Sequence, residues 1–508
     1  MKSLRSHAHG HSLRLTAPRV RTASVIGLLC ALTACSTLPP YAKPSVDVPD
    51  RYASAPQASK GWSVSAPADA EPRGPWWTLF NDPELNRLEA RVDVSNQSVK
   101  KAVAQLQAAR AIVDYQRAGY SPTVTAGVSQ SRSRLSQDVL GHSLAGKTVP
   151  DYSAGVAASW EPDLFGRVKD ATVDARDTAQ ASDADLQAVR LSMSSELATD
   201  YFDLRSLDIQ KKLLDDTVAA YATSLKIVQQ QFAAGGIDAS AVTQAQTQLE
   251  STRTQDTDLD VERAKLQHAI ATLIGVPASS FSLPSDTTAI TVPSIPAGMP
   301  SQLLERRPDI AASERRVAAA NARIGEARAA FYPDLTLSAT AGLESTFFSP
   351  WLTAPSLFWS IGSQLAGTLF DGGRRDAALK GATAQYDGTV ADYRQTVLVA
   401  FQQVEDNLSA LQTLASEAQT QQRATAAARQ SLQLTTNRYQ AGAVSYLDVV
   451  TSQTIALSNE RTLDRIEARH IDASVALLKA LGGGWDSSSS IRETAKATSN
   501  ETLSETSK

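Results

Sequence analysis

One stretch of the chain matches a nucleotide-binding signature. The sequence GHSLAGKT, residues 141–148, satisfies the pattern G-x-x-x-x-G-K-[ST] of a phosphate loop. Such a loop needs a strand before it and a helix starting at its Lys-Thr pair, because the N–H groups of that helix hold the phosphates. Pro150 follows almost at once, and the alternating pattern after it is typical of a strand. We therefore interpret residues 141–148 as a loop between two strands.

The histidines do not form a metal-binding pattern. HAHGH, residues 7–11, lies in a segment that we predict is cleaved off, and the three remaining histidines are His142, His268 and His470. These three fall on separate predicted elements with no cysteine nearby, whereas a zinc site needs several such ligands together. No nucleophile, base and orienting residue form a set either. The sequence predicts a protein that is not an enzyme and holds no metal or cofactor.

Cys35 is the residue with a predicted chemical modification. Five basic residues and no acid precede an apolar run at 23–34, which is the pattern of a secretory signal peptide covering 1–34. The run ends in LTAC, which resembles the bacterial lipobox, where the cysteine becomes the diacylated first residue. The alternative is that Cys35 is only a small apolar residue near an ordinary cleavage site. Ser36 in place of Asp points, by resemblance to the sorting rule of lipoproteins, to the outer membrane.

Charge excludes one class of partner. The net charge of the whole chain is −4, and loss of the basic signal peptide makes the mature chain more acidic still. An acidic chain is a poor match for the phosphate backbone, so we expect no nucleic-acid partner. Three acyl chains on Cys35 would instead anchor the protein firmly in lipid.

Glycine, proline and hydrophobic periodicity divide the mature chain into segments. Residues 35–75 are rich in proline and are predicted to be an extended tether. Stretches without glycine or proline predict helices, and a period of two predicts strands. The helices are expected at 83–118, 168–234 and 239–273, then one ending at ARAAFYP (327–333), 374–441 and a last one to 481; the strands are PTVTAGV (122–128), DYSAGVAASW (151–160), DLTLSATAGL (334–343) and LFWSIGSQLAGTLF (357–370).

The two halves of the chain repeat each other. Phe232 and Tyr439, Gly235 and Gly442, Gln246 and Gln453, and Gly275 and Gly482 all lie 207 residues apart. One offset across four landmarks indicates an internal duplication. The first repeat is predicted at 76–275 and the second at 301–484, with a connecting segment at 276–300 and a disordered tail at 485–508.

The lengths of the elements favour a membrane barrel joined to packed helices. Apolar residues on the second long helix, from Val397 through Val404 to Ala418, follow a heptad-like 4, 3 spacing for packing against other helices. Each half-length helix pair could lie end to end beside the long one. Four strands of about ten residues suit an outer-membrane barrel, and eight aromatic residues between 331 and 370 fit its interfacial belts. Four strands cannot close a barrel, so several chains must contribute.

Specific phrases along the chain resemble one family. WWTLFNDPEL, WEPDLFGR, PSQLLERRPDI, ARAAFYPDLTL, KALGGGW and the two glycine turns, together with LTAC, resemble the outer membrane factors of tripartite efflux systems, the TolC superfamily, and within it the OprM-type or NodT-type lipoproteins. The resemblance implies a homotrimer with a 12-stranded β-barrel, four strands per chain, and a 12-helix periplasmic α-barrel. It also implies partners: a periplasmic adaptor and an inner-membrane pump of the RND type.

The resemblance places gating and adaptor docking at the two glycine turns. Tyr439, Gly442, Leu447 and Asp448 match the second turn of the family. Phe232, Gly235, Gly236 and Ser240 fit the first, and Arg438 and Val444 complete the set of candidate tip residues. Some relatives carry a charged latch where this chain has Val444 and Thr451, so closure is expected to depend on apolar packing and on residues such as Arg438 and Asp448. Both glycines also suit the left-handed caps that any tight helical hairpin needs.

The resulting hypothesis is a passive outer-membrane duct for small molecules such as drugs and toxic organic compounds, with an extension into the periplasm. A type I protein-secretion duct is the alternative use of the same fold. A periplasmic coiled-coil scaffold lipoprotein is the alternative from another class, and it would need no barrel.

Overall fold

The structure is a computed structural model that describes residues 38–47, 52–54, 75–134, 136–138, 146–293, 295 and 307–483. The predicted signal peptide, Cys35, most of the GHSLAGKT loop and the predicted C-terminal tail lie outside these residues. The chain divides into two compact units. One, the sheet-bearing unit, comprises 1–42, 112–176 and 318–387; the other, the helical unit, comprises 43–111, 177–317 and 388–508.

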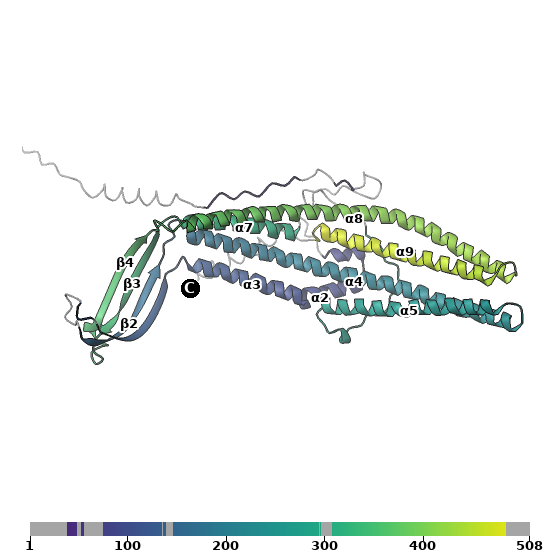
Figure 1. Ribbon diagram of the computed structural model, residues 1–508, viewed down its shortest axis with the longest axis horizontal. Helices are drawn as coiled ribbons and strands as arrows, with labels where there is room; N and C mark the ends of the chain where they lie inside the picture. Colours follow the sequence, from purple (N-terminus) through teal and green to yellow (C-terminus); the bar gives the residue numbers. More distant parts are fainter. Residues whose placement is uncertain are drawn as a thin grey trace, which may run out of the picture. The chain divides into compact units, whose positions relative to one another are not determined.

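A four-stranded antiparallel sheet is the centre of the sheet-bearing unit (Figure 1). Its strands, in the spatial order of the sequence, are β1 (Thr123–Arg134), β2 (Thr148–Trp160), β3 (Asp334–Ser345) and β4 (Leu357–Ala366). All four predicted strands are confirmed, but β4 ends at Ala366 rather than near residue 370. Gly372 and Gly373 follow with positive φ, +66° and +86°, and turn the chain toward the next helix. Leu369, predicted to share the strand's apolar face, is 98% exposed beyond it.

The sheet has one apolar and one polar face, as the period of two predicts. Residues opposite one another on neighbouring strands share a face. One such row on the apolar face is Val124, Ala158, Ala339 and Ile361, and the next is Ala126, Val156, Ala341 and Trp359. On the polar face a row reads Thr125, Ala157, Thr340 and Ser360. The large apolar side chains are exposed, for example Ile361 at 78%.

A row of glycines crosses the polar face of the sheet. Gly127, Gly155 and Gly342 are aligned across three strands, and Phe358 is the fourth member of the row. A Cβ added to Gly342 would lie 2.5 Å from the carbonyl oxygen of Ala154 and 2.7 Å from Cα of Gly155. The glycine therefore permits a close approach of the neighbouring backbone that a side chain at this position would prevent.

The helices reproduce the predicted two-fold repeat. The long helices α4 (Arg167–Ala233) and α8 (Arg374–Gln440) have 67 residues each, and α5 (Ala239–Leu273) and α9 (Tyr446–Ala480) have 35 each. The other helices among the described residues are α2 (Pro83–Ser95), α3 (Gln97–Ala118), α7 (Pro308–Ala329) and the short 3-10 helices η1 (Trp76–Phe80), η2 (Ala278–Ser280) and η3 (Ala354–Ser356). None of the helices in the part of the chain that the structure describes is both long and apolar enough to cross a membrane.

The predicted single helix at 83–118 is wrong, because it is interrupted at Asn96. The Asn96 side chain caps α3: its Oδ1 accepts from the N–H groups of Ser98, at 2.8 Å, and Val99, at 3.1 Å. Its Nδ2 donates to the carbonyl oxygen of Leu273, the last residue of α5, at 2.8 Å. This buried amide joins the end of one helix to the start of another.

Arg307 makes the equivalent joint in the second repeat. It immediately precedes α7, and its Nη1 donates to the carbonyl oxygen of Ala480, the last residue of α9, at 3.1 Å. The same guanidinium forms an ion pair with Asp309, in which Nη2 lies 2.6 Å from Oδ2. Leu273 and Ala480 are themselves 207 residues apart. The end-to-end arrangement predicted for the half-length helices is confirmed in both repeats, and RRPDI, residues 306–310, contributes a structural clamp.

The predicted packing stripe on α8 is largely confirmed. Val397, Val404, Leu408 and Leu411 are buried. Toward the end of the stripe Leu414 is buried, whereas Ala415 is half-buried.

Candidate functional site

The two hairpin ends, α4–α5 and α8–α9, have the same backbone geometry. At the first, Gly235 (φ +73°) donates to the carbonyl of Phe232 and Gly236 to that of Gln231, both at 2.9 Å. At the second, Gly442 (φ +73°) donates to Tyr439 and Ala443 to Arg438, again at 2.9 Å. Both are Schellman caps, whose left-handed residue is normally glycine. The predicted cap role of Gly235 and Gly442 is confirmed.

The two helices that follow the turns, α5 and α9, are capped at their N-termini by different side chains. Asp238 Oδ1 accepts from the N–H of Ser240 at 2.6 Å, and this backbone hydrogen bond lowers the pKa of Asp238. At the equivalent end, Asp448 Oδ2 accepts from the hydroxyl of Ser445, at 2.7 Å, and from its N–H, at 2.9 Å. These bonds lower the pKa of Asp448 below the ordinary aspartate value, with a smaller effect of Arg438. The Asp448 carboxylate is thus hydrogen-bonded within its own turn.

A small hydrophobic core joins the two hairpin ends. Val228, Ala245, Tyr446 and Val449 are its buried members. The rings of Tyr439 and Tyr446 meet edge to face, with centroids 5.4 Å apart. The Tyr439 hydroxyl donates to Gln231 Oε1 at 2.6 Å, which ties α8 to α4. Burial raises the pKa of Tyr446 to about 12, so its hydroxyl stays neutral.

Sequence analysis singled out Tyr439 but missed most of this core. The available signal was the offset of 207 residues, since Val449 of this core corresponds to Val242, which packs against it. Periodicity indicates which side of a helix is apolar, but it does not say which neighbouring helix that side meets.

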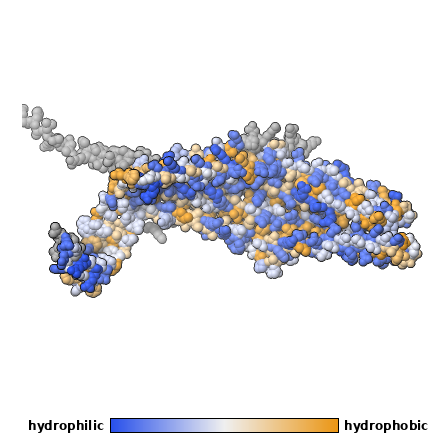
Figure 2. All heavy atoms as spheres, in the orientation of Figure 1, coloured by the Kyte–Doolittle hydropathy of each residue, from blue (hydrophilic) through white to orange (hydrophobic). Residues whose placement is uncertain are grey.

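The other predicted tip residues are largely solvent-facing. Phe232 is 46% and Leu447 is 54% exposed. Gly235, Gly236, Ser240, Arg438 and Gly442 are exposed too, and Val444 is half-buried. On the face drawn in Figure 2, hydrophobic residues reach the surface near the hairpin ends. The structure therefore does not gather all the predicted residues into one site; Tyr439 packs against the buried core, and most of the others, polar and apolar, lie at the surface.

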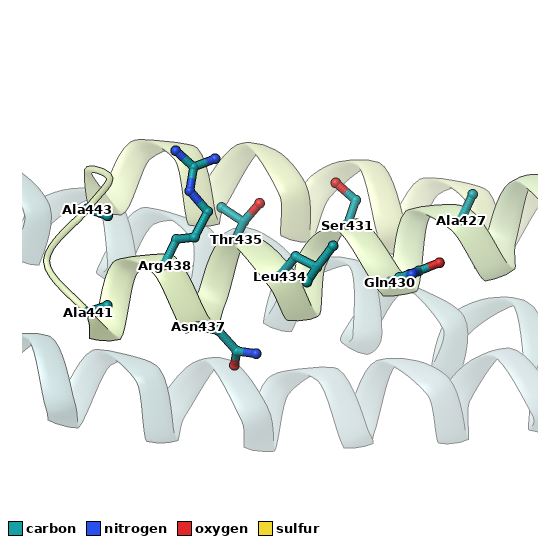
Figure 3. A pocket seen from close by; sticks show the side chains of 9 residues that line it. All are labelled: Ala427, Gln430, Ser431, Leu434, Thr435, Asn437, Arg438, Ala441 and Ala443. Atoms are coloured by element: carbon teal, nitrogen blue, oxygen red, sulfur yellow. The ribbon is translucent and has the colours of Figure 1, made fainter.

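A groove of about 630 Å³ runs along the C-terminal end of α8. We call it the α8 groove; its lining includes Ala427, Ser431, Leu434, Arg438 and Ala441. Figure 3 shows these side chains following one another along the helix, with Ala443 on the turn. The 4, 3 spacing places them on one side of α8. Leu434 is 56% exposed, and the described residues offer Arg438 no ion pair within 4.0 Å.

The first repeat carries an equivalent stripe on α4. Ala220, Ser224, Ile227 and Gln231 stand 207 residues before Ala427, Ser431, Leu434 and Arg438. Ile227 is 45% exposed, much like Leu434. The one change in charge is at the last position, where Gln231 replaces Arg438 and its side chain is held by Tyr439.

Aromatic residues lie at both ends of the sheet. At one end the Trp160 indole donates to the Tyr120 carbonyl at 3.1 Å, and Phe165 stacks on Tyr332 at 4.8 Å between centroids. At the other, Tyr152 contacts Phe348, with centroids 5.4 Å apart, and also Trp351. Interfacial girdles need aromatic residues at these two positions, and the membrane role of these residues stays a prediction. Phe358 does not belong to them, because its row places it on the polar face.

The phosphate-loop match is not followed by a helix. Thr148, its last residue, is the first residue of β2. Residues 141–145 lie outside the described part of the chain. The predicted strand after this loop is confirmed, and it lacks the helix N-terminus that phosphate binding requires.

The chain matches known proteins over most of its length. The family model described as "Outer membrane efflux protein" matches residues 88–276 and 299–483. The cation efflux system protein CusC of Escherichia coli O6:H1 is 32% identical over 460 residues, covering 90% of this chain and 97% of that protein. The toluene efflux pump outer membrane protein TtgC of Pseudomonas putida is 32% identical, with coverage of 89% and 93%.

Solved structures agree with the sequence comparisons. The outer-membrane channel OprN has a TM-score of 0.82 at 30% identity, covering 89% of this chain and 100% of that one. CusC superposes with a TM-score of 0.78 at 30% identity, again covering 89% and 100%. The mainly helical fold with four strands and an internal repeat is that of TolC-like outer membrane channels. The chain therefore belongs to the outer membrane efflux protein family, whose members act in the outer membrane as the channels of efflux systems.

Proposed function

We propose that this protein is the passive, trimeric exit duct of a tripartite efflux system. Three copies of the sheet close a twelve-stranded barrel, and three sets of helices enclose a twelve-helix tunnel. A periplasmic adaptor and an inner-membrane pump of the RND type deliver small molecules, such as drugs and toxic organic compounds. The duct itself performs no chemical step.

The sheet is the observation that carries this proposal. Its apolar face is exposed in one chain, its other face carries polar residues, and its two outer strands, β1 and β4, each pair with one strand among the described residues. An open sheet edge is not tolerated in lipid. Pairing β4 of one copy with β1 of the next supports closure with lipid outside and water inside. Four strands are half of the smallest bacterial barrel, so several copies are needed.

The α8 groove supports docking of an adaptor helix. Its small residues let another helix approach closely, and Leu434 offers an apolar anchor. Arg438 favours a partner with a carboxylate at the matching position. The equivalent stripe on α4 ends in the neutral Gln231, so the two docking positions differ in charge.

The N-terminal segment supports a lipid anchor at Cys35. Pro39, four residues later, accepts a hydrogen bond from Asn321 Nδ2 of α7 at 3.0 Å. A Cβ at Gly325 would lie 3.0 Å from Cδ1 of Leu38. The chain just after Cys35 thus lies on α7 within the sheet-bearing unit. Acyl chains at this position would enter the same bilayer as the sheet.

Reconstitution and genetics test the proposal together. The mature protein should be recovered from outer-membrane fractions as a heat-modifiable trimer that conducts ions in planar bilayers. Deletion should increase sensitivity to hydrophobic toxicants. A conducting trimer whose deletion abolishes protein secretion and leaves toxicant sensitivity unchanged would favour the type I alternative. A soluble, non-conducting protein would overturn the duct and favour the scaffold.

A further inference from the structure

The charged residues of the four strands are sorted by face. They are Arg132, Arg134, Asp151, Asp334 and Glu344. Side chains alternate between faces along a strand, so Arg132 and Arg134 share the apolar face with Val124. The strand register places the three carboxylates on the polar face. The charge that the strands carry on the apolar face is therefore entirely positive.

The two arginines lie just beyond the apolar rows, at the end of the sheet that carries the β1–β2 and β3–β4 loops. On this face of β1, Val128 is 75% exposed and is followed by Gln130 and then by the arginines. Gln130 pairs with Tyr152, which belongs to the aromatic cluster at this end. At a rise of about 3.4 Å per residue, Arg132 and Arg134 follow that row by about 7 Å and about 14 Å. Aromatic rings mark the membrane interface, so the arginines reach the level of the lipid headgroups.

The chain offers these arginines little negative charge. Both are exposed, and the ion pairs of the described residues include neither of them. Residues 346–356, which form the β3–β4 loop at the same end, contain no charged residue, and residues 135–147 contain a single acid, Asp138. In the proposed trimer the β3–β4 loop of the next copy would adjoin β1 and would bring no counter-charge. The positive charge on this face therefore remains available to an external anion.

We propose that Arg132 and Arg134 bind the phosphate groups of a phosphorylated lipid in the outer leaflet of the membrane. This inference rests on the proposed function, because the trimeric barrel is what brings the apolar face into lipid. The planar guanidinium of arginine matches the oxygen atoms of phosphate. The acyl chains of the same lipid would lie against the apolar rows that include Val128. A free phosphate ion fits the charge but leaves those rows without a partner, so a lipid is the better occupant.

Binding of lipid A, an acylated disaccharide that carries phosphates, tests the proposal on the detergent-solubilised mature trimer. Arg132→Gln with Arg134→Gln should weaken binding about tenfold or more, because each basic residue beside an anionic lipid contributes to attraction. Dephosphorylated lipid A should bind the wild-type trimer as weakly, and inorganic phosphate should not displace lipid A. Lys100→Gln with Lys101→Gln is the matched control, since it removes the same charge from exposed positions on α3 and should leave binding unchanged.

A second variant keeps the composition of β1 and changes only the face. Arg132→Ser and Arg134→Ser combined with Ser131→Arg and Ser133→Arg move both arginines by one residue, to the polar face. All four positions are exposed, so the exchange requires no repacking of a core. This face-exchanged trimer should bind lipid A as weakly as the glutamine variant. Should it fail to assemble, the glutamine variant, which keeps both serines, decides the question.

Heat-modifiable migration and ion conductance separate failure of this inference from failure of the duct. Conducting trimers that bind lipid A equally in the wild-type and glutamine forms would overturn the inference and leave the duct intact. Equal binding of phosphorylated and dephosphorylated lipid A, or displacement by inorganic phosphate, would overturn it too. A protein that forms no conducting trimer would overturn the duct and this inference together.

Discussion

Replacing Gly342 with alanine should destabilise the sheet and, with it, the proposed trimer. The added Cβ would lie 2.5 Å from the carbonyl oxygen of Ala154 and 2.7 Å from Cα of Gly155, both of them backbone atoms of β2. Real Cβ contacts essentially never fall below 3.0 Å, so β2 and β3 must move apart at this row. Overpacking of this kind costs about 1–3 kcal/mol per site, and a trimer contains the site three times.

The assay is the thermal dissociation of detergent-solubilised trimer, followed by heat-modifiable migration on gels. Gly362→Ala is the matched control, because it adds the same methyl group to the same polar face. Its Cβ would meet nothing nearer than Ser338 Oγ, at 3.5 Å. We expect Gly342→Ala to lower the dissociation temperature clearly and Gly362→Ala to leave it nearly unchanged.

The variant Phe358→Ala distinguishes two explanations of a loss of stability in Gly342→Ala. The Phe358 ring atom Cε1 is 3.0 Å from the added Cβ, so displacement of the ring could account for a loss of stability. If backbone contact is the cause, Phe358→Ala should not rescue Gly342→Ala. Equal losses for Gly342→Ala and Gly362→Ala, or full rescue by Phe358→Ala, would refute the reasoning from the glycine row.

Three other predictions concern the helical unit. Gly442→Val should weaken adaptor binding in a pull-down without dissociating the trimer. Gly442 has a left-handed backbone conformation, which costs a residue with a side chain about 1–2 kcal/mol of stability. Gly442→Asn should have a milder effect, because asparagine tolerates this conformation better. Arg307→Ala should lower stability by about 1.5–3 kcal/mol in thermal unfolding, since it removes a charged hydrogen bond to Ala480. Burial raises the pKa of Glu89 from 4.5 to about 9, so the native state should lose stability as pH rises between these two values. Glu89→Gln should remove that loss in thermal unfolding measured across this pH range. Parallel plots of melting temperature against pH for the two proteins would contradict the prediction.

The long helices and the strands were predictable because each depends on local sequence. The absence of glycine and proline from 168–234 allows one uninterrupted helix, and α4 begins and ends within one residue of that range. Alternation from Tyr152 to Trp160 requires one apolar face, and β2 has it. Such patterns are decided by neighbours in the sequence, so no tertiary contact is needed to recognise them.

The helix break at Asn96 was not predictable in the same way. The sequence around it, VSNQS, contains neither glycine nor proline and suits a helix or a cap equally well. The deciding contact is the hydrogen bond to Leu273, 177 residues away. Phe358 is a similar case, because aromatic composition suggested a membrane belt, whereas register with Gly342 places it on the polar face.

The repeat predicts backbone shape better than it predicts chemistry. Asn96 and Arg307 occupy equivalent joints and make the same kind of bond with different side chains. At the hairpin ends the Schellman caps are alike, yet Gln231 is bound by Tyr439 while Arg438 faces the α8 groove. Backbone geometry requires only a glycine and a cap, so the side chains around it were free to diverge. A trimer would therefore present six similar ends that alternate between the neutral Gln231 and the positive Arg438, and an adaptor hairpin with a single acidic residue should distinguish between them.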